Sequence, residues 1–127
     1  MTEREKNMAT IVLVDDDRDN ARLIQILLEM DGFSVMVFPD VKGAIVAAEP
    51  DIGAFVIDCN LAHGGDGVDL LRAIRRGDTK ADNDLPVILT SGDDRRSIEA
   101  ENAGATSFLL KPYSPSALSV ELSQLIK

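Results

Sequence analysis

The chain has 127 residues, of which 45% are hydrophobic, so it can build one buried core and no second domain. Its 13 Lys and Arg residues against 22 Asp and Glu residues give a formal net charge of −9, which disfavours direct binding to nucleic acid or to an anionic membrane. No apolar run approaches the roughly 18–20 residues of a membrane-spanning helix, and residues 1–8 have no apolar stretch that could act as a secretion signal, so we expect a cytoplasmic protein.

Short apolar runs along the chain are expected to form β-strands. Most lack a polar–apolar alternation, which is typical of strands buried on both faces of a parallel sheet. In chain order they are Thr10–Val14, Phe33–Phe38, Ala54–Ile57, Pro86–Leu89 and Ser107–Leu110. We expect residues 1–8 to form a flexible tail and residues 9–127 to form a single domain.

The segments between the predicted strands carry apolar residues at helical spacing, on one face of a helix with 3.6 residues per turn. These residues are Leu23, Ile24, Leu27 and Leu28; Val41, Ile45 and Ala48; Leu70, Leu71 and Ile74; and Leu118, Leu122, Leu125 and Ile126. A further helix near residues 94–103 has Ile98 as its only large apolar residue, so we expect it to be partly exposed and mobile.

Alternating strands and helices predict repeated βαβ units, which close right-handedly into a parallel sheet with helices on both faces. The expected fold is therefore a doubly wound α/β domain with a five-stranded sheet. In open sheets of this class, ligands bind beyond the carboxyl ends of the strands. The residues that follow the predicted strands are Asp15, Asp16 and Asp17; Asp58; Thr90 and Ser91; and Lys111.

This set of residues indicates a site for phosphoryl chemistry. Clustered carboxylates repel one another unless a cation compensates them, and carboxylate oxygens suit Mg²⁺. Lys111 would add a second positive charge and Thr90 a hydroxyl donor, which together provide the charge neutralisation that phosphoryl transfer needs. Asp58 stands apart from the acidic pair and is the candidate nucleophile, since a carboxylate can attack phosphorus to give an acyl phosphate.

Several of these residues also have a simpler structural interpretation. Asp17 and Asp19 fit capping of the first helix, since aspartate is favoured at helix N-termini. Asp15 and Asp16 lie closer to the apolar strand, which favours metal binding for them. The single cysteine, Cys59, fits a small packing residue. One cysteine and one histidine exclude an internal disulfide and the usual multi-residue zinc sites, so a metal would bind oxygen.

Four sequence motifs occur in a fixed order along residues 9–127: VLVDDD at 12–17, VIDCNL at 56–61, VILTSG at 87–92 and LKPY at 110–113. In order and spacing they resemble the acidic pair, the phosphoacceptor strand, the strand that ends in a switch threonine, and the Lys-Pro-aromatic motif of the receiver domains of two-component response regulators, including chemotaxis-type single-domain regulators. The resemblance implies a flavodoxin-like (βα)5 fold with strand order 2-1-3-4-5.

The resemblance also implies that Asp58 accepts a phosphoryl group from a phosphohistidine on a histidine kinase or a histidine phosphotransfer protein. Asp16 and Asp58 would ligate Mg²⁺ directly, with the backbone carbonyl of Asn60 as a third ligand and Asp15 acting through a bound water. Mn²⁺ would be a substitute for Mg²⁺.

Other residues acquire roles through the same resemblance. Lys111 would contact a phosphoryl oxygen, and the Lys111–Pro112 peptide bond would be cis. The hydroxyl of Thr90 would move toward the phosphoryl group while the aromatic ring of Phe108 moves inward, and Ser91, the next residue in the chain, is a candidate binding residue. The surface of the fourth helix, fifth strand and fifth helix would then change, as in a two-state switch that a local charge event biases.

The implied function is a phosphorelay switch that promotes only its own phosphorylation and dephosphorylation and is not a turnover enzyme. Its output would be the binding of a downstream protein, with no direct contact to nucleic acid or membrane and with phosphorylation-dependent homodimerisation as a further option. Receivers commonly carry proline where this chain has Ala62, and the stretch 62–67 is one residue longer than usual. Asn60 and Gly92 would tune loss of the phosphoryl group.

Three alternatives remain open on the sequence alone. The first is a pseudo-receiver that binds partners without being phosphorylated. The second is a phosphohydrolase of the haloacid-dehalogenase type built on Asp15–Asp17, although its later acidic pair, Asp93 and Asp94, would precede Lys111 in the wrong order. The third is a flavodoxin-like cofactor binder, which the three aspartates disfavour because they would repel a phosphate.

Overall fold

Five parallel strands form one sheet in the order β2-β1-β3-β4-β5, in a computed structural model that describes residues 9–63 and 65–126. The elements in chain order are β1 (Thr10–Val14), α2 (Arg18–Met30), β2 (Ser34–Phe38), α3 (Val41–Ala47), β3 (Ile52–Asp58), α4 (Gly67–Arg75), β4 (Val87–Ser91), α5 (Arg96–Asn102), β5 (Ser107–Leu110) and α6 (Pro115–Leu125). The predicted doubly wound fold and strand order are confirmed. The predicted flexible tail, residues 1–8, lies outside the described residues.

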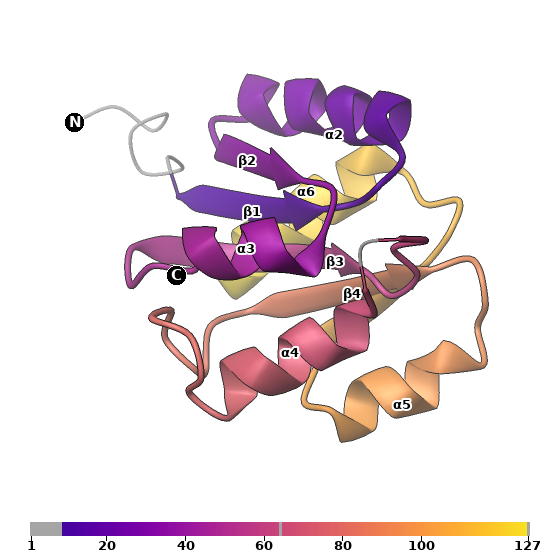
Figure 1. Cartoon of the computed structure of the whole chain (residues 1–127). Helices are drawn as coiled ribbons and strands as arrows, with labels where there is room; N and C mark the ends of the chain where they lie inside the picture. The colour runs from indigo at the N-terminus through magenta and orange to yellow at the C-terminus, as the bar shows by residue number, and fades with distance from the viewer. Residues whose placement is uncertain (1–8, 64, 127) are drawn as a thin grey trace.

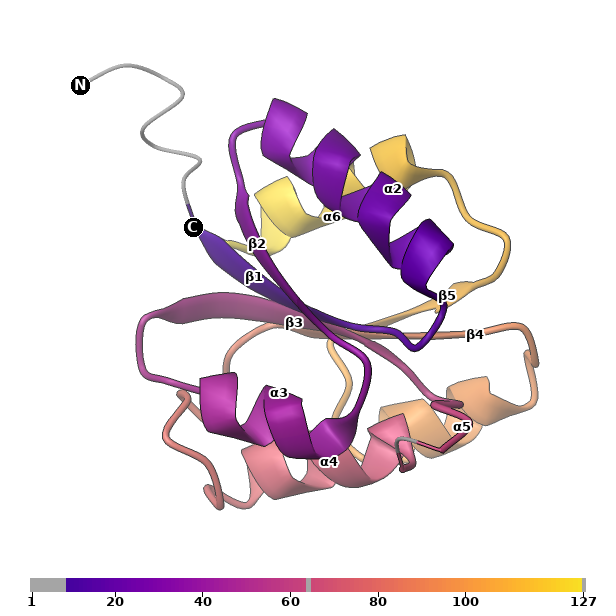
Figure 2. The ribbon, with the colours of Figure 1, turned by 45° about the horizontal axis from the view of Figure 1, so that its top comes forward.

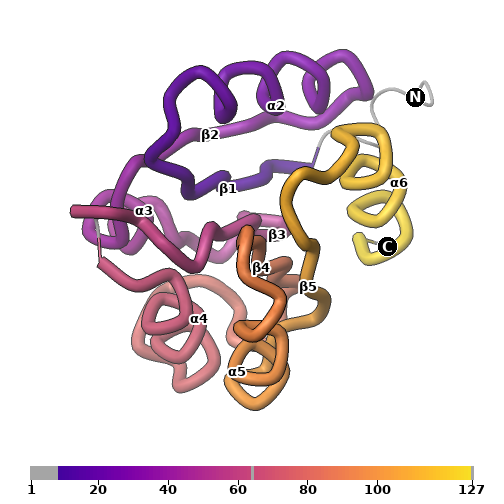
Figure 3. Tube along the Cα trace, turned by 90° about the vertical axis from the view of Figure 1, so that its right-hand side faces the viewer, coloured from indigo at the N-terminus to yellow at the C-terminus, as the bar shows by residue number. Residues whose placement is uncertain are grey.

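Helices cover both faces of the sheet (Figure 1). Figure 2 shows α2 and α6 on one face and α3, α4 and α5 on the other, and Figure 3 shows the same two layers from the carboxyl ends of the strands. Each face has its own buried apolar cluster, because alternate residues of a strand point to opposite faces: Ile11 and Leu13 pack with α2, while Val12 and Val14 pack with α3 and α4.

Strands β3 and β4 continue further at their carboxyl ends than the apolar runs predict. β3 extends to Asp58 and β4 to Ser91, whereas the apolar runs end at Ile57 and Leu89. Asp58 pairs with Thr90 in the parallel ladder, so backbone pairing continues into the polar residues. Hydrophobic runs locate a strand but do not show how far its hydrogen-bonded pairing continues.

The burial of the helix residues agrees only in part with the predicted apolar faces. Ile24 and Leu28 of α2 are buried, but Leu23 is 53% exposed, and Ile45 of α3 is 40% exposed. The apolar face that the spacing predicts is therefore only partly the buried face, because small residues such as Ala21 and Ala44 also occupy it. The weak helix, α5, is partly exposed as expected, with Ala100 its only buried residue.

The helix starts follow the sequence signals. The Asp17 carboxylate accepts a hydrogen bond from the backbone N–H of Asn20 at 3.1 Å, so Asp17 caps α2 as predicted, and Asp19 lies in the first turn. Asp66 caps α4 in the same way, with its carboxylate 2.9 Å from the N–H of Val68. Within the described residues, none of the helices has both the length and the apolar character needed to cross a membrane.

Arg75, at the end of α4, joins two loops on the side of the sheet opposite the carboxyl ends of the strands. Its guanidinium donates to the backbone carbonyls of Gly104, Asn83 and Leu85, each at 2.8 Å. A fourth hydrogen bond goes to the hydroxyl of Thr106 at 3.3 Å. Hydrogen bonds from a charged donor are among the stronger ones, so this side chain holds the loops before β4 and β5 together.

We expect Arg75→Met to lower the free energy of unfolding by about 2 kcal/mol, because several carbonyls lose a charged donor while the aliphatic packing is kept. Urea denaturation followed by circular dichroism measures the change. Arg76→Met is the matched control, since Arg76 is 62% exposed and its one ion pair within residues 9–63 and 65–126 is with Asp78; it should change stability by less than about 0.5 kcal/mol. Equal losses in the two variants would contradict this assignment.

Candidate functional site

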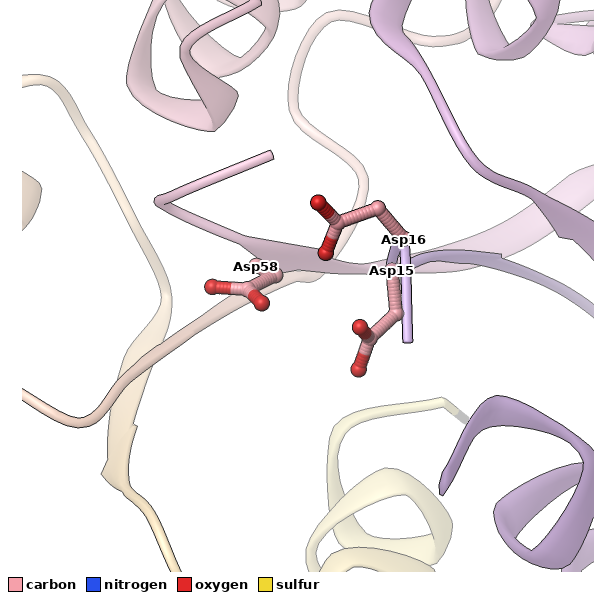
Figure 4. Close-up of side chains that lie close together, drawn as sticks. All are labelled: Asp15, Asp16 and Asp58. Atoms are coloured by element: carbon pink, nitrogen blue, oxygen red, sulfur yellow. The ribbon is translucent and has the colours of Figure 1, made fainter. Parts of the chain in front are cut away.

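Three carboxylates meet at the carboxyl ends of β1 and β3. Asp15 and Asp16 follow β1 and Asp58 ends β3, and one oxygen of each lies within 4.8 Å of the others. Figure 4 shows the three side chains facing a common space. Asp15 and Asp58 are buried, with 3% and 7% of their surface exposed, and Asp16 is half-buried. We call these three residues the acidic cluster.

Hydrogen bonds from neighbouring groups fix two of these carboxylates. Asp15 accepts from the backbone N–H of Asp17 at 2.9 Å and from the side-chain amide of Asn20 at 3.3 Å. One oxygen of Asp58 accepts from the backbone N–H of Asn60 at 3.0 Å. The start of helix α2 therefore orients Asp15, and the loop after β3 orients Asp58.

Lys111, directly after β5, reaches the cluster from across the sheet. Its Nζ donates to Asp58 Oδ2 at 2.8 Å and to Asp15 Oδ2 at 3.4 Å. Burial lowers the pKa of the Lys111 ammonium, but the hydrogen bond to Asp58 and the charges of both acids outweigh it, so the net pKa is raised and the group is held charged.

The phosphoacceptor candidate has a perturbed carboxyl group. Burial raises the pKa of Asp58, and the hydrogen bond and charge of Lys111, together with the N–H of Asn60, only partly oppose this rise. The negative charge of Asp15 raises the pKa further. A buried carboxylate that is held among other carboxylates is a site that a compensating cation would stabilise.

The polar residues at the end of β4 lie beside this cluster. Thr90 is buried and pairs with Asp58 in the ladder. Ser91 is fully buried, and its hydroxyl accepts from the backbone N–H of Asp93 at 3.0 Å and from the side-chain amide of Asn60 at 3.4 Å. The backbone carbonyl of Ser91 accepts from the N–H of Lys111 at 2.8 Å, which ties β4 to the lysine.

The remaining predicted residues lie around the end of β5. Phe108 is half-buried and packs against the apolar cluster that includes α3 and α4. The peptide bond between Lys111 and Pro112 is cis. Pro112 also lines a pocket with Lys111, Tyr113 and Asp17, beside α2.

The acidic pair that the phosphohydrolase alternative would use lies elsewhere. Asp93 forms an ion pair with Arg95 at 2.8 Å, which helps to hold the pKa of Asp93 at about 2, and Asp94 is exposed. Among the described residues, neither belongs to the acidic cluster. The geometry therefore favours Asp58, which that alternative leaves without a role.

The backbone conformation of Ala62 fits the absence of the proline that receivers commonly carry at this position. Its φ is 41°, in the left-handed region that L-residues rarely adopt. A proline ring fixes φ near −65°, so the more usual proline could not adopt this backbone. His63 is exposed in the same loop, and Gly64 lies outside the described residues.

Sequence reasoning gave no site role to Gly67 or Tyr113. A Cβ on Gly67 would collide with the backbone carbonyl of Asp58 and lie 2.7 Å from Ile57 Cγ2, so only glycine fits there. Tyr113 has a raised pKa, through burial first and then through the charges of Asp15 and Asp58. The aromatic residue of the LKPY motif was a signal for Tyr113, whereas the need for glycine at 67 appears only in three dimensions.

Comparison with known proteins agrees with this geometry. Residues 11–123 match the family model of the response regulator receiver domain. The chain therefore belongs to the receiver domain family of two-component response regulators.

Individual relatives support the assignment. The chain is 34% identical over 111 residues to the C4-dicarboxylate transport transcriptional regulatory protein DctD of Rhizobium meliloti, over 86% of this chain and 23% of DctD. It is 30% identical over 122 residues to the transcriptional regulatory protein CpxR of Escherichia coli, over 94% of this chain and 50% of CpxR. The chain thus spans half or less of the length of these two relatives. The solved receiver domain of the Francisella response regulator 1452 superimposes with a TM-score of 0.82 at 26% identity, over 93% of this chain and 96% of that one.

The close contact at Gly67 predicts a large effect of a single methyl group. Gly67→Ala should lower the free energy of unfolding by about 2 kcal/mol or more, because the new Cβ must push back the backbone that carries Asp58. Thermal or urea unfolding measures the loss. Gly92→Ala is the control, since a Cβ there meets nothing within 4 Å; a comparable loss in both variants would refute the explanation.

Cys59 should behave as a packing residue. The residue is 1% exposed, and burial raises the pKa of its thiol to about 11. We expect the folded protein to react very slowly with Ellman's reagent at pH 8 and the urea-unfolded protein to react completely, because the thiolate is the reactive species. Complete reaction of the folded protein within minutes would show that this thiol is accessible.

Proposed function

We propose that this chain is a phosphoacceptor switch of a two-component system, in which Asp58 accepts a phosphoryl group from a phosphohistidine on a histidine kinase or a histidine phosphotransfer protein. The observation that carries the proposal is the position of Asp58, buried among other carboxylates and 2.8 Å from the Lys111 ammonium. Membership of the receiver family supports the same conclusion.

The chemistry requires one bond to form and one to break. A carboxylate oxygen of Asp58 attacks phosphorus, the phosphorus–nitrogen bond breaks, and the imidazole of the donor leaves with the electron pair. The product is an acyl phosphate on Asp58. Lys111, already paired with this carboxylate, would hold a phosphoryl oxygen, and the N–H of Asn60 would keep the carboxyl group in position.

The donor set of the acidic cluster fits a hard divalent cation. Three carboxylates offer oxygens within 4.8 Å of one another, and Mg²⁺ prefers oxygen ligands and keeps several waters. In our proposal Asp16, Asp58 and the backbone carbonyl of Asn60 hold Mg²⁺ directly, Asp15 acts through water, and Mn²⁺ can replace Mg²⁺. When bound, the ion neutralises negative charge on the carboxylate and phosphoryl oxygens.

Phosphorylation is proposed to change the surface formed by α5, β5 and α6. The hydroxyl of Thr90 would move toward the phosphoryl group, and the ring of Phe108 would turn inward. A downstream protein, or a second copy of this chain, would recognise the changed surface. The domain, residues 9–127, promotes only its own phosphorylation and dephosphorylation in the cytoplasm and binds neither nucleic acid nor membrane directly.

Incubation with Mg²⁺ and acetyl phosphate tests the proposal. We expect intact mass spectrometry to show the gain of one phosphoryl group, and we expect EDTA or Asp58→Asn to abolish it, because the acceptor oxygen or its compensating cation is then missing. Asp69→Asn is the matched control, since Asp69 is an exposed carboxylate on α4 with 71% of its side chain accessible; it should gain the phosphoryl group normally.

A different outcome would favour the pseudo-receiver. If neither acetyl phosphate nor phosphoramidate adds mass, and beryllofluoride does not bind, Asp58 is not a phosphoacceptor and the chain acts by binding partners alone. Phosphorylation that persists in Asp58→Asn would place the acceptor on another residue.

A further inference from the structure

Arg96, in the first turn of α5, connects this helix to the loop after β3. Its Nη1 donates to the side-chain oxygen of Asn60 at 2.7 Å, and its Nη2 contacts both carboxylate oxygens of Asp66 at 3.1 and 3.0 Å. Its Nε donates to Glu99 at 3.0 Å on its own helix. Only 17% of the Arg96 side chain is exposed, whereas its partners Asp66 and Glu99 keep 41% and 40% of their side chains accessible, so these contacts lie at the surface.

The two residues that Arg96 contacts on the loop after β3 also pair with each other. Asn60 and Asp66 form an isolated antiparallel bridge, and Asp66 also caps α4. The backbone N–H of Asn60 donates to the carboxylate of Asp58 at 3.0 Å. A displacement of Asn60 would therefore move a donor that directly orients the proposed phosphoacceptor.

The side-chain amide of Asn60 forms hydrogen bonds through both its oxygen and its nitrogen. Its oxygen accepts from Arg96, and its amide nitrogen lies 3.4 Å from the hydroxyl of Ser91, the residue after Thr90. Arg96 thus fixes the rotation of this amide, and the amide bridges the loop after β3 to the end of β4.

Helix α5 has few other anchors. Ala100 is its only buried residue, and no side chain caps its N-terminus. The neighbouring Arg95 is 87% exposed and, among the described residues, forms an ion pair with Asp93 alone. Arg96 is therefore the main polar connection between α5 and the loop beside Asp58.

We propose that Arg96 is a positioning residue that holds Asn60 beside Asp58 and thereby couples α5 to phosphorylation. Arg96 itself is not placed against the phosphoryl group and acts through Asn60. The inference rests on the proposed function and adds a residue of α5 to it.

The first test needs no phosphorylation. Arg96→Gln removes the guanidinium group that contacts Asn60 and Asp66. We therefore expect the backbone amide proton of Asn60 to exchange with water faster, by about threefold or more. NMR on the metal-free protein measures this rate. Arg95→Gln, the matched control on the same turn, should leave this rate unchanged. An unchanged rate in Arg96→Gln would overturn the positioning role, whether or not the chain is phosphorylated.

The second test measures the consequence for the site. With acetyl phosphate and Mg²⁺, the rates of phosphoryl gain and of phosphoryl loss to water in Arg96→Gln should both fall by about 3–10-fold, since misplaced groups at Asp58 slow both reactions. Calorimetric titration with Mg²⁺ should show about 10-fold weaker binding, the usual effect of losing a partner of a ligand residue. Arg95→Gln should match the wild type in all three quantities.

A double mutant separates positioning from general loosening of the fold. In the Asn60→Ala background, Arg96→Gln should change the rate of phosphoryl loss by less than about 1.5-fold, because residues that act through one another are not additive. A full multiplicative effect in that background would show that Arg96 acts by another route and would overturn the inference. If the wild type itself gains no phosphoryl group, the proposed function fails, while amide exchange at Asn60 still decides the role of Arg96.

Discussion

The structure depends on holding several carboxylates together at the end of a parallel sheet. Asp15 directly follows β1 and Asp58 ends the neighbouring strand β3, and both are nearly removed from water. Such an arrangement is costly unless positive charge compensates it. Lys111 supplies part of that compensation at 2.8 Å from Asp58. One lysine among three acids leaves negative charge in excess, which is the physical reason for a cation site here.

The topology makes this meeting possible. The order β2-β1-β3-β4-β5 puts β1 beside β3 at the centre and brings β5 in along β4. Residues that are far apart in sequence, such as Asp15 and Lys111, then lie within hydrogen-bond distance. The apolar clusters on the two faces hold the strands in place, and hydrogen bonds from the start of α2 and from the loop after β3 then orient Asp15 and Asp58.

The sequence was sufficient to predict the sheet, the strand order and the residues of the acidic cluster, because each depends on local patterns and recognisable motifs. It was insufficient for contacts that form only across the fold. Ile45 appears as a core residue from its spacing, yet the alanines of α3 are buried instead. Gly67 looks like one of several loop glycines until its contact with the Asp58 carbonyl is seen. Arg96 gives no signal, because its partners on the loop after β3 lie far away in sequence.

The partly buried Tyr113 gives the protein an intrinsic optical reporter. The chain has one tyrosine and no tryptophan, so all of its tyrosine fluorescence comes from this ring. The ring lines the same pocket as Lys111, and its phenol senses the charges of Asp15 and Asp58. A change in the charge at the carboxyl ends of the strands therefore acts on the one tyrosine of the molecule, and the state of the site can be followed in solution without an attached label.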